Sequence, residues 1–287
     1  MTSPRILLAA HNISPKKQLG QNFIIDPTFT EKIVKRAGIL PEDIVLEIGA
    51  GLGALTIPLA RRARKVIAIE KDRQIVPILN TEVLVSGLTN ISIIEKDILS
   101  VDISALIEDM DGKIVVMGNL PYNISSQILV QLIRSRAGIS RAVLMFQKEL
   151  AHRLTADSGC KDYGRLTVML RYCSDIKKLV DVKASLFFPK PKIDSEILEI
   201  KFKKEIDHKA VDELFFFKVI KSGFGNRRKT LKNALAASEL NIDADAAKKM
   251  LEKSGIDPIR RAETLSVEEF VKLSNFLIGN KQNWERS

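Results

Sequence analysis

The fold is decided by the stretch Ile44-Val45-Leu46-Glu47-Ile48-Gly49-Ala50-Gly51-Leu52-Gly53-Ala54. Its first five residues are mostly apolar and β-branched, which predicts a buried strand. The glycines that follow let the backbone turn tightly and let a ligand approach the main chain closely. Helical spacing then runs from Ala54 to Ala63. A strand, a glycine-rich turn and a helix in this order predict the start of a βαβ unit.

The same alternation continues along the chain. Four further apolar segments predict buried parallel strands: Lys65–Ile69, Ile91–Ile94, Ile114–Met117 and Ala142–Phe146. Between some of them lie segments with helical spacing, at Gln74–Val85 and Ser126–Arg134. Two later strand candidates, Lys177–Val182 and Ser195–Phe202, are joined by a segment with two prolines and no crossover helix. We therefore predict an α/β fold with a doubly wound, Rossmann-like sheet that is mostly parallel and carries an antiparallel edge hairpin.

Both ends of the chain differ from this pattern. The first 40 residues are basic and loop-rich until a helix begins, with Asp26 as its cap and Pro27 in its first turn. After about residue 205, strand signals disappear and four helices are predicted, at Val211–Ser222, Arg228–Ala237, Ala244–Lys253 and Val267–Gly279. The expected domains are therefore residues 1–205, with the sheet, and residues 206–287, a small all-α domain.

Composition limits the class of protein. The chain has 287 residues, 45% of them hydrophobic, and a net charge of +10, which suits a polyanionic partner, either nucleic acid or an anionic membrane surface. Many basic proteins bind neither partner, so the net charge alone does not decide whether this chain binds nucleic acid, a membrane surface or neither. Cys160 and Cys173 show no metal-binding spacing and are expected to be reduced thiols of a cytoplasmic protein. The three histidines are scattered, so no metal site is predicted, and no apolar run approaches the ~18 residues of a membrane span.

The glycine turn alone is ambiguous, because Gly49, Gly51 and Ala54 also fit the pattern of nicotinamide cofactor sites. Glu70 closes the next strand, where a carboxylate can accept hydrogen bonds from two ribose hydroxyls. Asp97-Ile98 follows the third strand, where the acid can bond an adenine amine and the aliphatic side chain can pack on its ring. Either acid could instead be a solvated charge at a strand end. Together with the spacing G-x-G-x-G and the lack of a hydride-transfer partner, they favour S-adenosylmethionine.

The fourth strand ends in Gly118-Asn119-Leu120-Pro121-Tyr122. The side-chain oxygen of Asn119 and the backbone carbonyl of Leu120 can accept the two N–H bonds of an exocyclic amine. Pro121 fixes φ and adds no donor, and Tyr122 can stack on the base that carries the amine. Phe187, in a proline-rich loop, is the candidate for the opposite stacking surface, although core packing also explains such a residue. These residues predict chemistry on a nucleobase amino group.

Basic side chains are concentrated in the helical part. Between Leu214 and Ser238 there are six and no acid: Lys218, Lys221, Arg227, Arg228, Lys229 and Lys232. A glycine-rich interruption precedes Arg227, so an arginine-rich helix start is expected to meet phosphates. We predict RNA binding by Arg227, Arg228, Lys229, Lys221 and, beside the Phe187 loop, Lys190. A solvated basic face is the alternative.

The motifs in this order resemble the ribosomal RNA adenine dimethyltransferase family, in its small-subunit, kasugamycin-sensitivity type. The resemblance spans nearly the whole chain: besides the glycine turn, Glu70 and Asp97-Ile98, the matching segments are Lys17–Ile24, Asn119–Ser125, Gln147–Glu149, Lys161–Leu166, Phe187–Ser195 and Phe224–Leu231. Ser126-Gln127 stands where the family often has Thr-Pro, which puts in question only how the following helix begins.

The resemblance implies a role for each matching residue. Asn22 and Ile24, the latter where leucine is usual, help to bind S-adenosylmethionine. Gly51 and Ile98 are predicted to bind it from their places in the glycine turn and after the third strand. Gly49 contacts the methionine part of the cofactor, Glu70 its ribose and Asp97 its adenine, and Asn119 lies between cofactor and target. The implied activity is dimethylation of two adjacent adenines near the 3′ end of small-subunit (16S) rRNA, within a 30S-type pre-ribosomal particle. A role in small-subunit biogenesis, a monomeric state and a cytoplasmic location are expected with it.

Three alternatives stay open. A macrolide-resistance methyltransferase of large-subunit rRNA shares the cofactor motifs, although the segment Gly225–Thr230 favours the small-subunit type. An adenine-specific DNA methyltransferase would usually carry a separate target-recognition domain. A non-enzymatic ribosome-assembly or transcription factor could keep the same fold, but the intact cofactor and Asn-Leu-Pro-Tyr positions argue against loss of activity.

Overall fold

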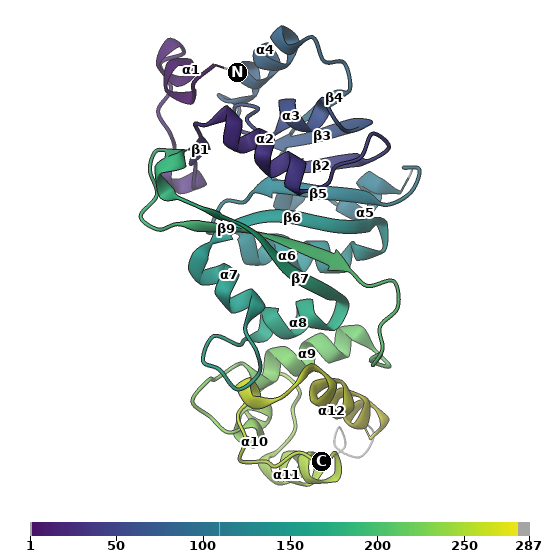
Figure 1. Ribbon diagram of the computed structural model, residues 1–287. Helices are drawn as coiled ribbons and strands as arrows, with labels where there is room; N and C mark the ends of the chain where they lie inside the picture. The colour runs from purple at the N-terminus through teal and green to yellow at the C-terminus, as the bar shows by residue number, and fades with distance from the viewer. Residues whose placement is uncertain (1, 109, 281–287) are drawn as a thin grey trace. The chain divides into compact units, whose positions relative to one another are not determined.

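The computed structural model describes residues 2–108 and 110–280. The chain forms two compact units, which are described separately. The first comprises residues 1–151 and 176–202, and the second comprises residues 152–175 and 203–287. Figure 1 shows the elements of both.

A seven-stranded sheet is the centre of the first unit, in the order β4-β3-β2-β5-β6-β9-β7. The strands are β2 (Ile44–Ile48), β3 (Lys65–Glu70), β4 (Ile91–Glu95), β5 (Ile114–Asn119), β6 (Ile139–Gln147), β7 (Ser174–Val182) and β9 (Ser195–Phe202). β4, β3, β2, β5 and β6 are parallel neighbours, and β9 runs antiparallel to β6. The predicted doubly wound sheet is therefore confirmed, with β7 and β9 as neighbours at the predicted edge.

Helices lie on both faces of this sheet (Figure 1): α2 (Pro27–Arg36), α3 (Thr56–Ala60), α4 (Val76–Ser86), α5 (Ile103–Ile107) and α6 (Ser125–Arg134), followed by α7 (Lys148–Thr155). Every residue of β2 is buried, because helices cover both of its faces. As predicted, Asp26 caps α2 by accepting from the amides of Thr28 and Phe29. The short 3-10 turns are Lys17–Leu19, Ile98–Ser100, Arg136–Gly138, Ala184–Leu186 and Ala262–Thr264.

The N-terminal segment is more ordered than the sequence indicates. Helix α1 (Pro4–Ala10) buries Leu8 against Phe23, Leu52 and Ile75. The two-residue strand β1 (Phe23–Ile24) pairs antiparallel with β8 (Phe187–Phe188). These contacts fix the N-terminal segment beside the carboxyl ends of the parallel strands.

The second unit contains α8 (Arg165–Cys173), α9 (Glu213–Gly223), α10 (Leu231–Ala236), α11 (Ala244–Lys253) and α12 (Val267–Gly279). The Tyr172 ring of α8 lies 4.6 Å from the Phe216 ring of α9, so residues 152–175 pack with the C-terminal helices. The boundary between the two units is therefore not a single cut near residue 205, because residues 152–175 belong to the second unit. The assignment of cofactor and RNA to separate domains remains a prediction.

The predicted helix start at Arg228 is wrong, since α10 begins at Leu231. The backbone N–H of Leu231 bonds Arg260 O, and that of Lys232 bonds Pro258 O. The first helical amides are thus satisfied by a distant segment, and residues 227–229 form a turn.

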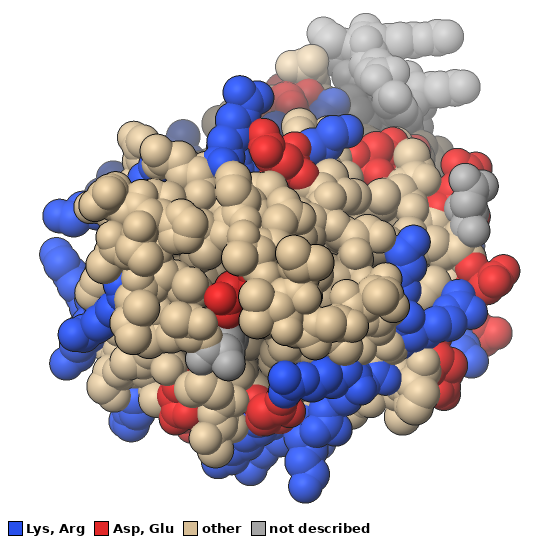
Figure 2. Space-filling view, turned by 90° about the horizontal axis from the view of Figure 1, so that it is seen from above, with Lys and Arg blue, Asp and Glu red and all other residues tan. Residues whose placement is uncertain are grey.

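Figure 2 shows the face of the first unit that carries α1 and α4. Uncharged side chains fill its middle, and lysines and arginines lie around the margin. Two apolar side chains of α4, Leu84 and Val85, are 81% and 78% exposed. The net charge of the chain is therefore not concentrated on this face. None of the helices within residues 2–108 and 110–280 is long and apolar enough to cross a membrane.

Candidate active site

A pocket of about 180 Å³ opens where β2, β3, β4 and β5 end at their carboxyl edge. This edge is where open α/β sheets bind ligands. All eight predicted cofactor residues line the pocket: Asn22, Ile24, Gly49, Gly51, Glu70, Asp97, Ile98 and Asn119. Pro121 also lines it, whereas Leu120, Tyr122 and Phe187 do not. The structure thus brings the residues from five separate segments together.

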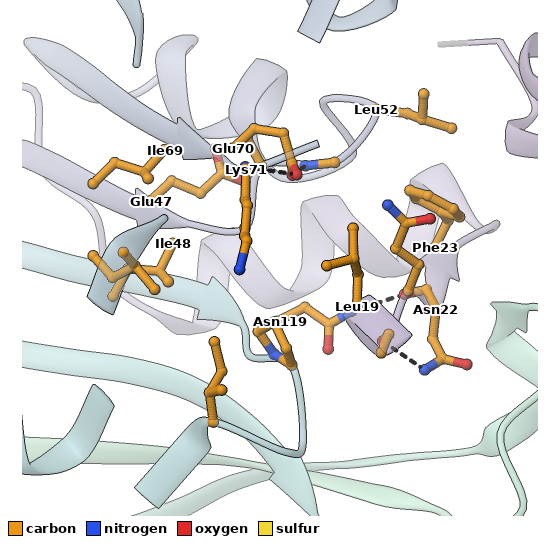
Figure 3. A pocket seen from close by; sticks show the side chains of 18 of the residues that line it. Leu19, Asn22, Phe23, Glu47, Ile48, Leu52, Ile69, Glu70, Lys71 and Asn119 are labelled. Atoms are coloured by element: carbon orange, nitrogen blue, oxygen red, sulfur yellow. Dashed lines mark hydrogen bonds between the residues drawn. The ribbon is translucent and has the colours of Figure 1, made fainter. Parts of the chain in front are cut away.

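The glycine turn after β2 is held by Glu70. Gly49, Gly51 and Gly53 have φ values of 77°, 55° and 86°, a conformation that favours glycine. The Gly51 N–H donates to Glu70 Oε2 at 2.8 Å, and the N–H groups of Lys71 and Asp72 donate to Oε1 at 2.8 Å (Figure 3). Burial raises the pKa of Glu70 despite these bonds. A carboxylate has about four acceptor sites, so about one remains for a ligand in this arrangement.

Asp97, at the end of β4, is paired with Lys71. Lys71 Nζ lies 2.6 Å from Asp97 Oδ2, and the Leu99 N–H donates to Oδ1 at 3.1 Å. The hydrogen bond from Lys71 lowers the pKa of Asp97, so this carboxylate is ionised at neutral pH. Ile98 is buried beside it and presents an aliphatic surface to the pocket.

Asn119 has a fixed orientation. Its Nδ2 donates to the backbone oxygen of Asn22 at 2.9 Å, as Figure 3 shows. Because a carbonyl oxygen can only accept, this contact places the amide nitrogen toward Asn22 and leaves Oδ1 as an acceptor. The preceding Gly118 allows close packing of β5 on β2, since a Cβ there would lie 2.5 Å from Ile48 O.

An ion pair that the sequence analysis missed fixes the N-terminal wall of the pocket. Asp72, 3% exposed, accepts from Lys16 Nζ at 2.6 Å and from Gln21 Nε2 at 2.7 Å. Burial alone would raise its pKa, but the bonds from Lys16 and Gln21 hold the pKa of Asp72 below its usual range. Asp72 is 56 residues from Lys16 and 51 from Gln21, so no local pattern indicates their contact.

Glu47 is a second feature that we did not predict. It lines the pocket from β2, is 1% exposed, and its Oε2 has no hydrogen-bond partner among the described residues. Burial raises the pKa of Glu47 to about 8, while the nearby Thr56 hydroxyl lowers it and the charge of Glu70 raises it. The sequence did contain a signal, since a glutamate within an otherwise apolar buried strand is unusual.

The two predicted stacking residues lie outside the pocket lining. Tyr122 is half-buried, and its hydroxyl lies 3.0 Å from Ser195 Oγ; burial raises the pKa of Tyr122, against the effect of that hydrogen bond. Phe187 is 2% exposed and belongs to the main hydrophobic core, with Ile24 as its β1–β8 partner. In this conformation Phe187 packs as a core residue, so stacking on a base requires its ring to become exposed. Its stacking role stays a prediction.

Comparison with known proteins identifies this arrangement. The family described as "Ribosomal RNA adenine dimethylase" matches residues 12–278. The chain belongs to this family.

The names of similar proteins agree with this family. "Ribosomal RNA small subunit methyltransferase A" of Desulforapulum autotrophicum is 51% identical over 277 residues, which cover 96% of this chain and 97% of that protein. The protein of the same name from Magnetococcus marinus is 41% identical over 271 residues, covering 94% and 95%.

Solved structures show the same relationship. The dimethyladenosine transferase from Plasmodium falciparum has a TM-score of 0.74 and 29% identity, with 91% of this chain and 98% of that chain covered. The 23S rRNA methyltransferase ErmE has a TM-score of 0.66 and 25% identity, covering 90% and 100%. Membership of the adenine dimethylase family confirms the predicted resemblance, the fold and the class of enzyme.

The basic residues predicted to bind RNA are exposed: Arg227, Arg228, Lys229, Lys221 and Lys190. Lys190 lies in the first unit and the others in the second. Lys221 forms an ion pair with Glu239 at 3.0 Å, and Arg227 donates to Lys161 O and lies 3.8 Å from Glu263. Arg228 and Lys229 lie in the turn before α10 rather than at a helix start. Their binding of RNA remains a prediction in this family member.

Residues 2–108 and 110–280 contain no group of three His, Cys, Asp or Glu side chains that could hold a metal ion.

Proposed function

We propose that this protein uses S-adenosylmethionine to dimethylate the exocyclic amines of two adjacent adenines near the 3′ end of 16S rRNA, within a 30S-type pre-ribosomal particle. The observation that carries the proposal is the orientation of Asn119, whose amide nitrogen is tied to Asn22 O at the pocket that Glu70 and Asp97 line. An acceptor is thus presented beside a site suited to an adenosine-containing cofactor. We place this activity in the cytoplasm and assign it to a monomer.

The residues of the pocket fit the cofactor. Asp97 is ionised and can accept from an adenine amine, while Ile98 can pack on the ring. Glu70 retains about one acceptor site for a ribose hydroxyl, so a bond to both hydroxyls requires exchange of one backbone N–H. At Gly49, Gly51 and Gly53 the backbone turns without side chains, which leaves room for the methionine part.

When bound, S-adenosylmethionine supplies the methyl group and a good leaving group. The protein must then position the target amine, whose lone pair is delocalised into the adenine ring. Asn119 Oδ1 and the Leu120 carbonyl accept the two N–H bonds of that amine, which favours its pyramidal form and stabilises the positive charge that develops. Pro121 keeps the turn rigid and contributes no competing donor. The proton leaves to water after transfer.

Tyr122 is the proposed stacking surface on one face of the extruded adenine. Its ring is half-buried and its hydroxyl is fixed by Ser195 at 3.0 Å, so a base can stack without ordering the ring first. Phe187 is proposed for the other face and has to become exposed when RNA binds, because it is 2% exposed in the free chain. The second methylation requires the monomethylated amine to rotate, so the two stacking contacts must leave room for that rotation.

The small-subunit substrate is favoured over large-subunit RNA by the relatives with the highest identities given above. Those at 51% and 41% identity are named as small-subunit methyltransferases, whereas ErmE, a 23S rRNA methyltransferase, is 25% identical. A purely structural role in ribosome assembly is disfavoured by the oriented Asn119 and the ionised Asp97. An additional role in small-subunit biogenesis is compatible with the proposal.

The test is transfer of labelled methyl groups to small-subunit particles and, in parallel, to protein-free large-subunit RNA, followed by mapping of the modified bases. We expect two adjacent dimethylated adenines near the 3′ end of 16S rRNA. Labelling of large-subunit RNA instead, or no transfer to either substrate, would contradict the proposal.

A further inference from the structure

Residues 16–23 of the N-terminal segment approach both the glycine turn and the Asn-Leu-Pro-Tyr turn. A Cβ added to Gly51 would lie 3.3 Å from the Phe23 ring, and a Cβ added to Gly20 would lie 3.6 Å from Pro121. One side of the segment therefore packs beside the cofactor part of the pocket, and the other side packs beside the acceptors of the target amine. A shift of this segment would disturb both.

One backbone carbonyl of this segment decides which way the Asn119 amide points. Asn119 Nδ2 donates to Asn22 O at 2.9 Å (Figure 3). A rotation of the amide by half a turn would place Oδ1 against Asn22 O, and two acceptors cannot form a hydrogen bond. The proposed mechanism needs Oδ1 to face the target amine. The position of the Asn22 carbonyl therefore selects the productive orientation of Asn119.

The Asp72 carboxylate holds both ends of the turn that precedes Asn22. Its Oδ1 accepts from Lys16 Nζ at 2.6 Å, and its Oδ2 accepts from Gln21 Nε2 at 2.7 Å. The Lys16 N–H in turn donates to Gln21 Oε1 at 2.8 Å, which closes the turn. Asp72 is itself fixed, because its backbone oxygen accepts from the Val76 N–H at the start of α4 at 3.1 Å. It is 3% exposed and lies outside the pocket lining, so it acts on the pocket only through its partners.

This arrangement requires a group that accepts at both of its oxygens. An amide at position 72 would turn its NH₂ group toward either Lys16 or Gln21, and two donors cannot form a hydrogen bond. If Gln21 reversed its own amide to compensate, its NH₂ group would face the Lys16 N–H instead. While this geometry is kept, an amide at position 72 thus leaves one of the three hydrogen bonds unmade. Asp72→Asn therefore loosens the turn with almost no change in side-chain shape.

We propose that Asp72 is a positioning residue for methyl transfer, which fixes the orientation of Asn119 through residues 16–22. This inference rests on the proposed function and extends it to a residue outside the pocket. Asp72 touches neither cofactor nor target in this role. Its hydrogen bonds hold the turn, the turn holds the Asn22 carbonyl, and that carbonyl holds the Asn119 amide. A residue that only stabilises the fold would not depend on Asn119 for its effect on the rate.

The first test is the single-turnover rate of methyl transfer to small-subunit particles, with the full chain saturated with S-adenosylmethionine. Asp72→Asn should lower this rate by about 10- to 100-fold, since misplacing a reacting group by about 1 Å can cost about 10²-fold. Asp43→Asn is the matched control. Asp43 pairs with Arg141 at 3.3 Å and precedes β2, at the sheet edge opposite the pocket, so its loss should leave the rate nearly unchanged.

The same change in the Asn119→Ala background tests the route of the effect. Asp72→Asn should cause little further loss there, because the amide that it orients is absent. Losses from two independent residues would multiply, and a multiplied loss overturns the inference. Lys16→Met removes one of the two bonds to Asp72 at a position where the side chain is 31% exposed, and it replaces Asp72→Asn if that variant does not fold. Its loss should be smaller and should also disappear in the Asn119→Ala background.

A second measurement needs no activity. The side-chain amide signals of Asn119 in nitrogen–proton NMR spectra are identified by their absence from Asn119→Ala. They should shift in Asp72→Asn and stay in place in Asp43→Asn. Unchanged Asn119 signals in Asp72→Asn overturn the inference and leave the proposed function intact. If the wild-type protein transfers no methyl group, the proposed function fails, and the spectra still decide whether Asp72 orients Asn119.

Discussion

Replacing Glu47 by glutamine should change how the stability of the first unit depends on pH in the cofactor-free protein. The pKa of Glu47 is about 8 in the folded chain and 4.5 for an ordinary glutamate. Between these values the folded state binds more protons than the unfolded state, so stability falls as pH rises. One pKa unit corresponds to about 1.4 kcal/mol, so the full loss above pH 8 is about 5 kcal/mol. Glutamine does not ionise, so Glu47→Gln lacks this loss.

Hydrogen exchange of the β2 amides measures this difference, since these buried amides exchange when the unit opens. Between pH 5.5 and pH 7.5, the free energy of opening of Glu47→Gln should increase relative to wild type by about 3 kcal/mol, from the same conversion. Comparison at one pH cancels the intrinsic exchange rate. A wild-type-to-variant difference that is the same at both pH values would refute the burial of a neutral Glu47.

Three further predictions concern the site and the RNA surface. Asn119→Ala should lower methyl transfer by about 10²–10³-fold, the range typical for loss of one hydrogen bond that stabilises a transition state, while cofactor affinity changes little. Asn80→Ala, on the exposed side of α4, is the control, and near-normal turnover of Asn119→Ala would contradict the mechanism. Gly118→Ala should shift β5 away from β2, because its Cβ would lie 2.5 Å from Ile48 O; turnover should fall with retained secondary structure, and unchanged turnover would show that the strand position is unimportant. Arg228→Ala should reduce the slope of log affinity against log salt by about one for RNA binding; an unchanged slope would exclude a phosphate contact.

The sheet could be predicted because its signals are local. Each parallel strand is a short apolar run followed by polar residues, and β2 to β6 appear close to the predicted positions. The cofactor residues could be predicted for the same reason, since carboxyl ends of parallel strands converge. Gly49, Glu70, Asp97 and Asn119 line one pocket because sheet topology brings those ends together.

The features that could not be predicted from the sequence depend on contacts between distant segments. The pairing of β1 with β8 joins residues more than 160 positions apart through two residues on each side, which leaves no periodic pattern. Asp72 carries no sign in the sequence that Lys16 and Gln21 are its partners. Phe187 was predicted at the site and lies in the core, because the β1–β8 pairing seals it from solvent.

Residues 70, 71 and 72 are consecutive, yet each contacts a different wall of the pocket. Glu70 binds the glycine turn, Lys71 binds Asp97 and Asp72 binds Lys16 on the N-terminal segment. The distance between these walls is therefore set by the length of one tripeptide. Insertion or deletion of a single residue here would separate all three walls at once, whereas a substitution would release only one. During evolution the length of this corner should thus be more constrained than its composition, and a variant enzyme for a larger cofactor analogue would have to change all three contacts together.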